Sequence, residues 1–270
     1  MSDKSKNILM VFVPVIAYFA VAESVAIILY FLRENGVVNI DGTVSQLIQT
    51  LFALPVVFFV FLRPEIRNYK KWHETQQAGS FPGKFRITDA ILSVVLMLTG
   101  SYALNNFAGL VNIAQYSASY ESIENSFYSG NIVCELAAFV ILSPLAEEVL
   151  YRGVVFLYIK RTLGMWPAIV ISAIMFAVFH MNLVQLIYAL ILGFYLSIVM
   201  ERSENLWIPI IGHVAANALS VIRGETGFLS VDSIGFDGYV ASAVMAFAIS
   251  LGIAVYICIK LGKRLNIVEK

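Results

Sequence analysis

Charged residues and histidines are scarce in this chain of 270 residues. Lys, Arg, Asp and Glu together make up 13% of it, and only three residues are histidine. That charged share is about half of what a soluble domain carries, so an ordinary soluble globule is excluded. With 18 basic and 18 acidic residues the formal net charge is zero, and nothing in this balance points to nucleic-acid binding.

Several chemical signatures are also missing. The two cysteines, Cys134 and Cys258, belong to no C-x-x-C motif, and we expect both to be small apolar packing residues rather than a disulfide. The sequence has no H-E-x-x-H pair of zinc ligands and no G-x-S-x-G nucleophile turn. It also contains no internal repeat or low-complexity tract. These absences leave few soluble enzyme classes open.

What the chain has in excess is apolar sequence. Hydrophobic residues make up 59% of it, against about 45–50% in soluble domains. Most of the apolar stretches reach the roughly 20 residues that a membrane-spanning helix needs, although Trp166–Phe179 is short. The stretches predict an all-α polytopic membrane protein, a single transmembrane domain over 1–270 with about eight spanning helices. The eight stretches are Ile8–Leu32, Val44–Leu62, Ile87–Ile113, Ile132–Ile159, Trp166–Phe179, Leu183–Met200, Trp207–Ile222 and Tyr239–Leu261.

The placement of basic residues predicts the orientation of these helices. If both termini are cytoplasmic, fifteen Lys and Arg residues fall in inner segments and only Arg33 and Arg223 in outer loops, with Arg152 inside a helix. This asymmetry satisfies the positive-inside rule. The longest polar connection, Arg63–Arg86, is then expected at the cytoplasmic surface, with His73 as a solvated loop histidine.

Ionisable groups interrupt the fourth apolar stretch, in the segment "SPLAEEVLYRG". A charge at the bilayer centre costs about 2.5–3.5 kcal/mol on insertion scales, so these groups require partners. Glu148 and Arg152 are spaced i, i+4 and can pair on one helix face. Glu147 points about 100° away from that face and is a candidate proton carrier. Pro144, just before the glutamates, should disturb the helix locally. The alternative is a purely structural role, in which this cluster only holds two helices together.

Two later segments place further polar groups in apolar surroundings. "FAVFHMN" contains His180, and "IGHVAANAL" contains His213 and Asn217 one helical turn apart. A glutamate base that activates water, together with donors that hold an oxyanion, suits peptide hydrolysis. A second version makes Glu147, His180 and His213 a His₂Glu zinc set. Each histidine could also simply hydrogen-bond a neighbouring helix.

Together the three segments resemble the E-E-x-x-x-R, F-x-x-x-H and H-x-x-x-N motifs of the CPBP intramembrane proteases. This family, also called the Abi family, includes the type II CAAX prenyl endopeptidase. The order and spacing of all three motifs fit over roughly Glu135–Leu219. The matching residues are Glu147, Glu148, Arg152, Phe176, His180, His213 and Asn217.

The resemblance implies an eight-helix fold with its catalytic core at about residues 131–222. It implies that Glu147 and His180 activate water and that His213 and Asn217 form the oxyanion hole. We favour a metal-free, glutamate-dependent version over a zinc version. The resemblance also implies a polar cavity that faces the cytoplasm. The expected partners are membrane lipid and a protein or peptide substrate, prenylated or not, and the expected location is a bacterial cell membrane.

Two functions of other classes compete with this interpretation. One is a catalytically silent membrane scaffold or bacteriocin immunity protein that binds a partner through the same fold. The other is a proton-coupled transporter, because buried Glu, His and Arg also form proton relays. The chain shows neither an inverted repeat nor paired broken helices, which disfavours the transporter.

Overall fold

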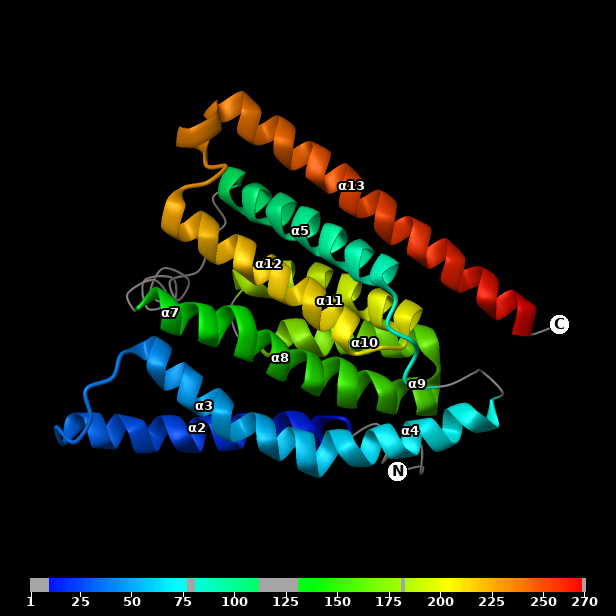
Figure 1. Cartoon of the computed structure of the whole chain (residues 1–270), viewed down its shortest axis with the longest axis horizontal. Helices are drawn as coiled ribbons and strands as arrows, with labels where there is room; N and C mark the ends of the chain where they lie inside the picture. The colour runs from blue at the N-terminus through cyan, green and yellow to red at the C-terminus, as the bar shows by residue number, and fades with distance from the viewer. Residues whose placement is uncertain (1–9, 77–80, 112–130, 181–182, 269–270) are drawn as a thin grey trace. The chain divides into compact units, whose positions relative to one another are not determined.

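The computed structural model describes residues 10–76, 81–111, 131–180 and 183–268 of the chain. Within these ranges every regular element is helical, and the elements join end to end into eight helical stretches (Figure 1). Elements labelled η are π-helical. The elements are α2 (Phe12–Glu34), α3 (Gly42–Val56), η1 (Val57–Leu62), α4 (Arg63–Thr75), α5 (Ile87–Leu110), α7 (Ile132–Glu135), η3 (Leu136–Leu142), α8 (Ser143–Glu148), η4 (Val149–Phe156), α9 (Leu157–Leu163), α10 (Met165–Val178), α11 (Leu183–Ser203), α12 (Trp207–Thr226) and α13 (Val231–Val268).

The eight stretches coincide with the eight predicted apolar segments, and the all-α polytopic membrane fold is confirmed. Among the described residues, five stretches are long and apolar enough to cross a membrane, and α10 is apolar but shorter. The other two stretches, α7 to α9 and α12, carry the polar motifs, which lower their hydropathy. The five spans are Phe12–Glu34, Gly42–Thr75, Ile87–Leu110, Gln185–Ser203 and Val231–Lys263. The cavity that faces the cytoplasm stays a prediction.

Two prolines explain where the helices change their winding. Pro144 is in the first turn of α8, and this helix directly follows η3. Pro64 is in the first turn of α4, which directly follows η1. A proline ring lacks an N–H and collides with the carbonyl four residues earlier. A π-helical stretch before the ring accommodates both defects without ending the helix, and such stretches are frequent at functional sites. The disturbance predicted at Pro144 therefore takes the form of a π-helix.

The expectation of a loop was wrong over the first half of the connection Arg63–Arg86, while its position at the cytoplasmic surface stays a prediction. Residues Arg63–Thr75 form α4, in which Glu65, Tyr69 and His73 are all buried. His73 is thus not a solvated loop histidine, and its ring stacks at 5.7 Å from that of Tyr69. The spacing i, i+4, i+8 places these three side chains on one face of the helix, a pattern that the high polarity of the segment hides.

Residues Met1–Ser80 and Ile123–Ala168 form one compact unit. In it α2 packs against α3, and α4 packs against α9. Arg161 of α9 donates two hydrogen bonds to Glu65 of α4, from Nε to Oε1 and from Nη2 to Oε2, both 3.2 Å long. This bidentate ion pair joins two helices that are far apart in the sequence.

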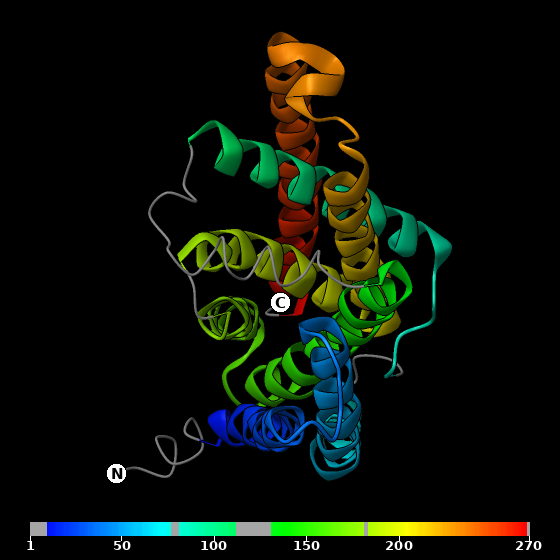
Figure 2. The ribbon, with the colours of Figure 1, turned by 90° about the vertical axis from the view of Figure 1, so that its left-hand side faces the viewer.

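Residues Phe81–Ser122 and Ile169–Lys270 form the second compact unit. Here α5 lies against both α12 and α13, as the two ribbon views show (Figures 1 and 2). The hydroxyl groups of Tyr102 on α5 and Ser242 on α13 are 2.7 Å apart. Near its start α13 is interrupted at Gly235, whose φ of 72° only glycine adopts readily.

The connection between α11 and α12 is held in place by polar contacts. Asp89, in the first turn of α5, accepts hydrogen bonds from Arg86 at 2.7 Å and from Arg202 at 3.0 Å. Asn205 donates to the carbonyl of Gly83 at 2.8 Å. These contacts fix the start of α12, the helix that carries His213 and Asn217.

Candidate active site

The first unit carries the two glutamates, on the continuous stretch formed by α8 and η4. Glu148 and Arg152 are 0% exposed, and Nη1 of Arg152 donates to Oε1 of Glu148 at 2.8 Å. The predicted i, i+4 pair is confirmed. A buried charge is tolerated when it is paired, so this pair lets the helix carry ionised groups within an apolar environment.

Glu147 has different neighbours from Glu148. It is partly buried and lies within electrostatic range of the tyrosines Tyr151 and Tyr18. Tyr18, on α2, is hydrogen-bonded to Thr50 on α3.

Sequence reasoning missed both tyrosines. Tyr151 follows Glu147 by four residues, just as Arg152 follows Glu148, so the i, i+4 rule could have found it. Tyr18 comes from another helix, and no local pattern indicates it. Two phenol groups near the carboxylate give Glu147 a polar environment inside an apolar helix bundle.

In the second unit, His180 lies just beyond the C-terminal end of α10. Its Nδ1 is 2.7 Å from the backbone carbonyl of Phe176, and its ring is edge-on to the Phe176 ring at 4.8 Å between centroids. The last carbonyls of a helix lack backbone partners, and here the imidazole replaces the N–H that a longer helix would supply. Since a carbonyl only accepts, the bond requires a proton on Nδ1. In the neutral ring Nε2 is then the acceptor.

His213 on α12 reaches the same phenylalanine ring. The ring centroids of Phe176 and His213 are 5.7 Å apart and the planes are nearly perpendicular. His213 is 5% exposed, and Asn217 follows it by one helical turn on the same face of α12. The structure thus brings His180 and His213 onto one aromatic ring.

Small residues permit this arrangement. Phe176 packs so closely against Gly193 of α11 that a Cβ there would lie 3.0 Å from the ring and 3.2 Å from Cα of Ala173. Gly212, the neighbour of His213, faces Ser93 on α5, and a Cβ on it would overlap the Ser93 hydroxyl. Glycine at both positions therefore lets the helices approach closely.

The predicted site residues fall into two sets, one in each unit. Glu147, Glu148 and Arg152 belong to the first unit, and Phe176, His180, His213 and Asn217 belong to the second. Among the described residues no three His, Cys, Asp or Glu side chains gather as a metal site would require. The predicted zinc set combines residues of both units and stays a prediction.

The fold and these side chains define a class: a polytopic helical membrane protein with buried carboxylate, guanidinium and imidazole groups. Residues 129–219 match the family model described as type II CAAX prenyl endopeptidase Rce1-like. The match covers about a third of the chain and includes all seven motif residues. The resemblance that the three motifs indicated is therefore confirmed over this segment.

Two curated proteins are each similar to about a third of the chain. "Putative membrane peptidase YdiL" of Bacillus subtilis (strain 168) is 28% identical over 82 residues, which is 30% of this chain and 34% of that protein. "Uncharacterized 24.3 kDa protein" of Escherichia coli is 28% identical over 99 residues, 35% of this chain and 46% of that protein. The chain thus covers less than half of either relative. No solved structure gives a significant match.

Proposed function

We propose that this chain is an intramembrane endopeptidase that hydrolyses a peptide bond in a membrane-associated or lipidated protein or peptide. The observation that carries the proposal is the pair of imidazoles, His180 and His213, on the single ring of Phe176. One buried and one partly buried histidine gathered in this way, within the segment that resembles a membrane endopeptidase, are more than helix packing requires.

In the proposed reaction Glu147 is the general base and His180 shares the water through Nε2. Glu147 takes a proton from the water, and the oxygen attacks the carbonyl carbon of the scissile bond. His213 and Asn217 donate hydrogen bonds to the oxyanion that forms. The proton then passes to the leaving nitrogen as the C–N bond breaks.

Glu148 and Arg152 take no part in these steps. Their ion pair satisfies two charges that would otherwise be unfavourable in the membrane. The face of the helix that carries the pair is fully buried, and Glu147, about 100° away around the helix, points toward a partly exposed side. Phe176 plays a similar supporting role for the two imidazoles.

The preferred mechanism requires no metal, and zinc on Glu147, His180 and His213 is the alternative. Zinc analysis of the purified protein, together with cleavage assays in the presence of a chelator, separates the two. The proposed partners are peptide or protein substrates, prenylated or not, and membrane lipids. The proposed location is a bacterial cell membrane, with both termini and the cleavage site on the cytoplasmic side.

The test is cleavage of a fluorogenic peptide library by the detergent-purified protein and by Glu147→Gln. Because loss of a general base lowers rates by about 10²–10⁴-fold, cleavage by the variant should fall to background. Glu23→Gln is the matched control, since Glu23 is an exposed glutamate of a membrane helix outside all three motifs. Its activity should equal that of the unmodified chain.

The outcomes separate the competing functions. Equal cleavage by the unmodified chain and Glu147→Gln would contradict the role of Glu147. If neither peptides nor prenylated peptides are cleaved, partner binding that survives in Glu147→Gln identifies a scaffold. Proton uptake coupled to solute movement in vesicles would identify a transporter instead.

A further inference from the structure

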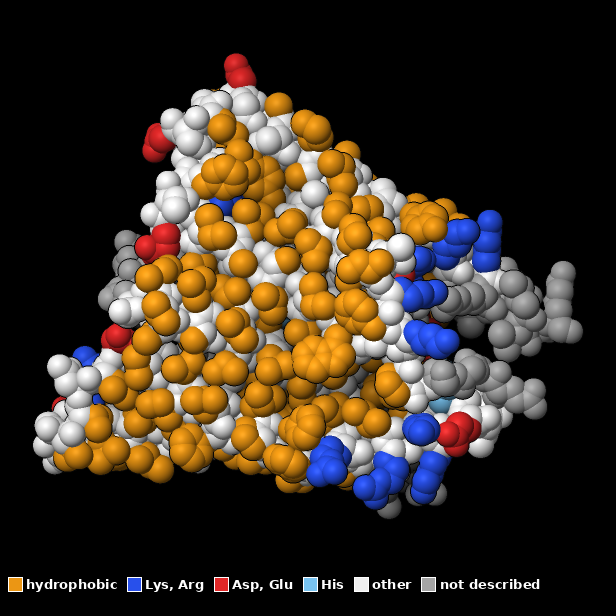
Figure 3. Space-filling view, viewed as in Figure 1, with side chains coloured by type: hydrophobic (Ala, Val, Ile, Leu, Met, Phe, Trp, Pro, Cys, Tyr) orange, Lys and Arg blue, Asp and Glu red, His pale blue; other side chains and the backbone are white. Residues whose placement is uncertain are grey.

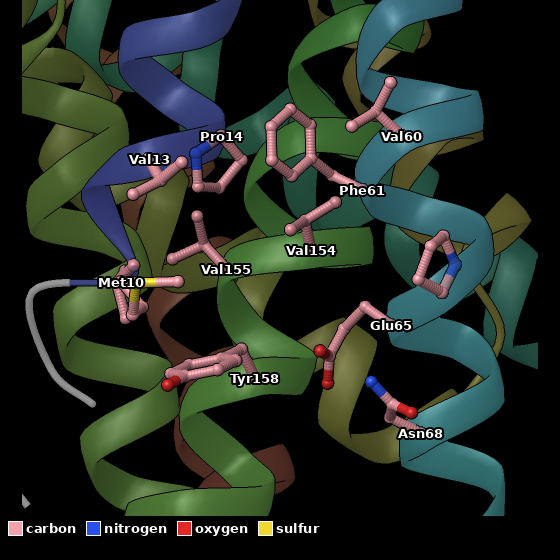
Figure 4. A pocket seen from close by; sticks show the side chains of 12 residues that line it. Met10, Val13, Pro14, Val60, Phe61, Glu65, Asn68, Val154, Val155 and Tyr158 are labelled. Carbon is pink, nitrogen blue, oxygen red and sulfur yellow. The ribbon is translucent and has the colours of Figure 1, made fainter. Parts of the chain in front are cut away.

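The first unit contains a cavity that the proposed reaction does not use. Its volume is about 180 Å³, and it lies among α2, η1, α4, η4 and α9. Figure 4 shows apolar side chains at one end, including Val13, Phe61 and Val154. Glu65, Asn68 and Tyr158 lie at the other end. The cavity is therefore amphipathic along its length.

A guanidinium group lies beside the polar end and contacts two of the residues that line it, Glu65 and Tyr158. Arg161 binds Glu65 through Nε and Nη2, and its Cζ lies 5.2 Å from the centroid of the Tyr158 ring. Its side chain is still 25% exposed, and its Nη1 makes no hydrogen bond to any of the described residues. The amide of Asn68, which is exposed, likewise has no hydrogen bond within the described ranges. Two donor groups are thus available where the cavity becomes polar.

The surface beside this end is basic. Glu65 is already neutralised by Arg161, so the excess charge comes from exposed residues of α4, where four cations face one exposed acid, Glu74. Lys71 follows Asn68 by three residues and so lies on the same side of the helix. Figure 3 shows Lys and Arg side chains gathered over α4, next to a surface of hydrophobic side chains. The cations are Arg63, Arg67, Lys70 and Lys71.

We propose that this cavity binds one anionic phospholipid. The phosphate accepts hydrogen bonds from Arg161 and Asn68, the net negative charge faces the cations of α4, and one acyl chain enters the apolar end. Basic pockets between membrane helices bind anionic head groups in this way. The inference is independent of the proposed peptidase activity, since none of these residues belongs to the three motifs.

The size of the cavity limits what enters it. An apolar cavity of about 150 Å³ accepts one benzene ring, so about 180 Å³ holds a segment of one acyl chain and not a whole lipid. Lipid tails are as apolar as the side chains of the cavity wall. Insertion of the acyl chain therefore depends on its shape and not on its polarity. Discrimination between lipids comes from the head group.

The test uses native mass spectrometry of the 270-residue chain. It measures how much lipid stays bound when the protein is released from detergent micelles. Phosphatidylglycerol and phosphatidylcholine with identical acyl chains are the two probes. The unmodified chain should retain one phosphatidylglycerol at saturation, with affinity about tenfold above that for phosphatidylcholine, because both lipids have the phosphate but only phosphatidylglycerol has a net negative charge for the cations of α4.

Three variants address the two ends of the cavity. Asn68→Leu removes one donor, and Glu65→Gln combined with Arg161→Gln removes the guanidinium without leaving a buried carboxylate unpaired. Val13→Trp fills the apolar end. Each should weaken phosphatidylglycerol binding about tenfold, the loss expected for one charge-assisted hydrogen bond or for the excluded chain.

Two controls match these changes. Ile16→Trp adds the same ring to an exposed position on α2 outside the cavity, and Lys84→Gln removes an exposed cation elsewhere. Both should bind as the unmodified chain does, and thermal unfolding checks that every variant is folded. Equal retention of the two lipids, no retained lipid, displacement by inorganic phosphate, or equal losses in the controls would each overturn the proposal.

Discussion

Glu147 and Glu148 are adjacent in the chain and both lie within electrostatic range of Arg152, yet their other surroundings differ. Glu148 is fully buried and held by Arg152, whereas Glu147 is partly buried and has two tyrosines nearby. A rotation of about 100° per residue produces this division. Glu148 is thereby held in an ion pair, and Glu147 has the polar environment that the proposed proton transfer requires.

At the residue scale we predict that removing one member of the Glu148–Arg152 ion pair lowers the stability of the protein more than removing both charges does. Arg152→Met leaves a carboxylate buried without its guanidinium, which should lower the free energy of unfolding by about 3–5 kcal/mol. Arg152→Met combined with Glu148→Gln should recover part of this loss, because no charge is left unpaired. Thermal unfolding in detergent measures both. A double variant less stable than Arg152→Met would show that the loss has another cause.

At the element scale a close contact between α10 and α11 supports the histidines. Gly193 has no room for a side chain beside Phe176, and Phe176 contacts both imidazoles. Positions on three helices therefore depend on one glycine. The i, i+4 step from Phe176 to His180 is local, but the contact with His213 requires α12 to lie beside α10.

We predict that Gly193→Ala separates these helices. Inserting a methyl group into a packed interface typically costs about 1–3 kcal/mol, and the displaced ring should also reduce peptide cleavage under the proposed function. Gly252→Ala is the control, because nothing lies within 4 Å of a Cβ there, and alanine in a helix interior is favoured by up to about 1 kcal/mol. Melting temperatures of the two variants should move in opposite directions. A Gly193→Ala variant as stable and active as the unmodified chain would refute the role of this contact.

The whole molecule is organised by the membrane. Lipid offers no hydrogen bonds, so every backbone polar group in it must be satisfied within a helix. Eight helical stretches result, and large apolar side chains such as Phe247, Leu251 and Val255 of α13 remain exposed. The two compact units interleave along the chain, and the motif residues are divided between them.

At this scale the distribution of basic residues predicts how the protein is oriented in the membrane, with both termini in the cytoplasm. Both cysteines are free, so a Cys134→Ala and Cys258→Ala background allows single reporters at the exposed positions Lys70 and Glu225. With cytoplasmic termini, Glu225→Cys should react with an impermeant maleimide in intact cells, and Lys70→Cys only after lysis. The reverse pattern would mean that the protein is inserted the other way round.

The sequence alone determined which apolar segments are helical, because hydropathy reports directly which residues can face lipid; it did not indicate the polar helix α4. It also determined the Glu148–Arg152 pair, since partners spaced i, i+4 meet on any helix. Tertiary structure alone decided the contacts between helices: Phe176 with His213, Tyr18 with the surroundings of Glu147, and Glu65 with Arg161, 96 residues apart. Such contacts depend on how far each helix is rotated and shifted along its neighbour. No hydropathy or local spacing encodes those two quantities, because they arise from the packing of whole helix faces.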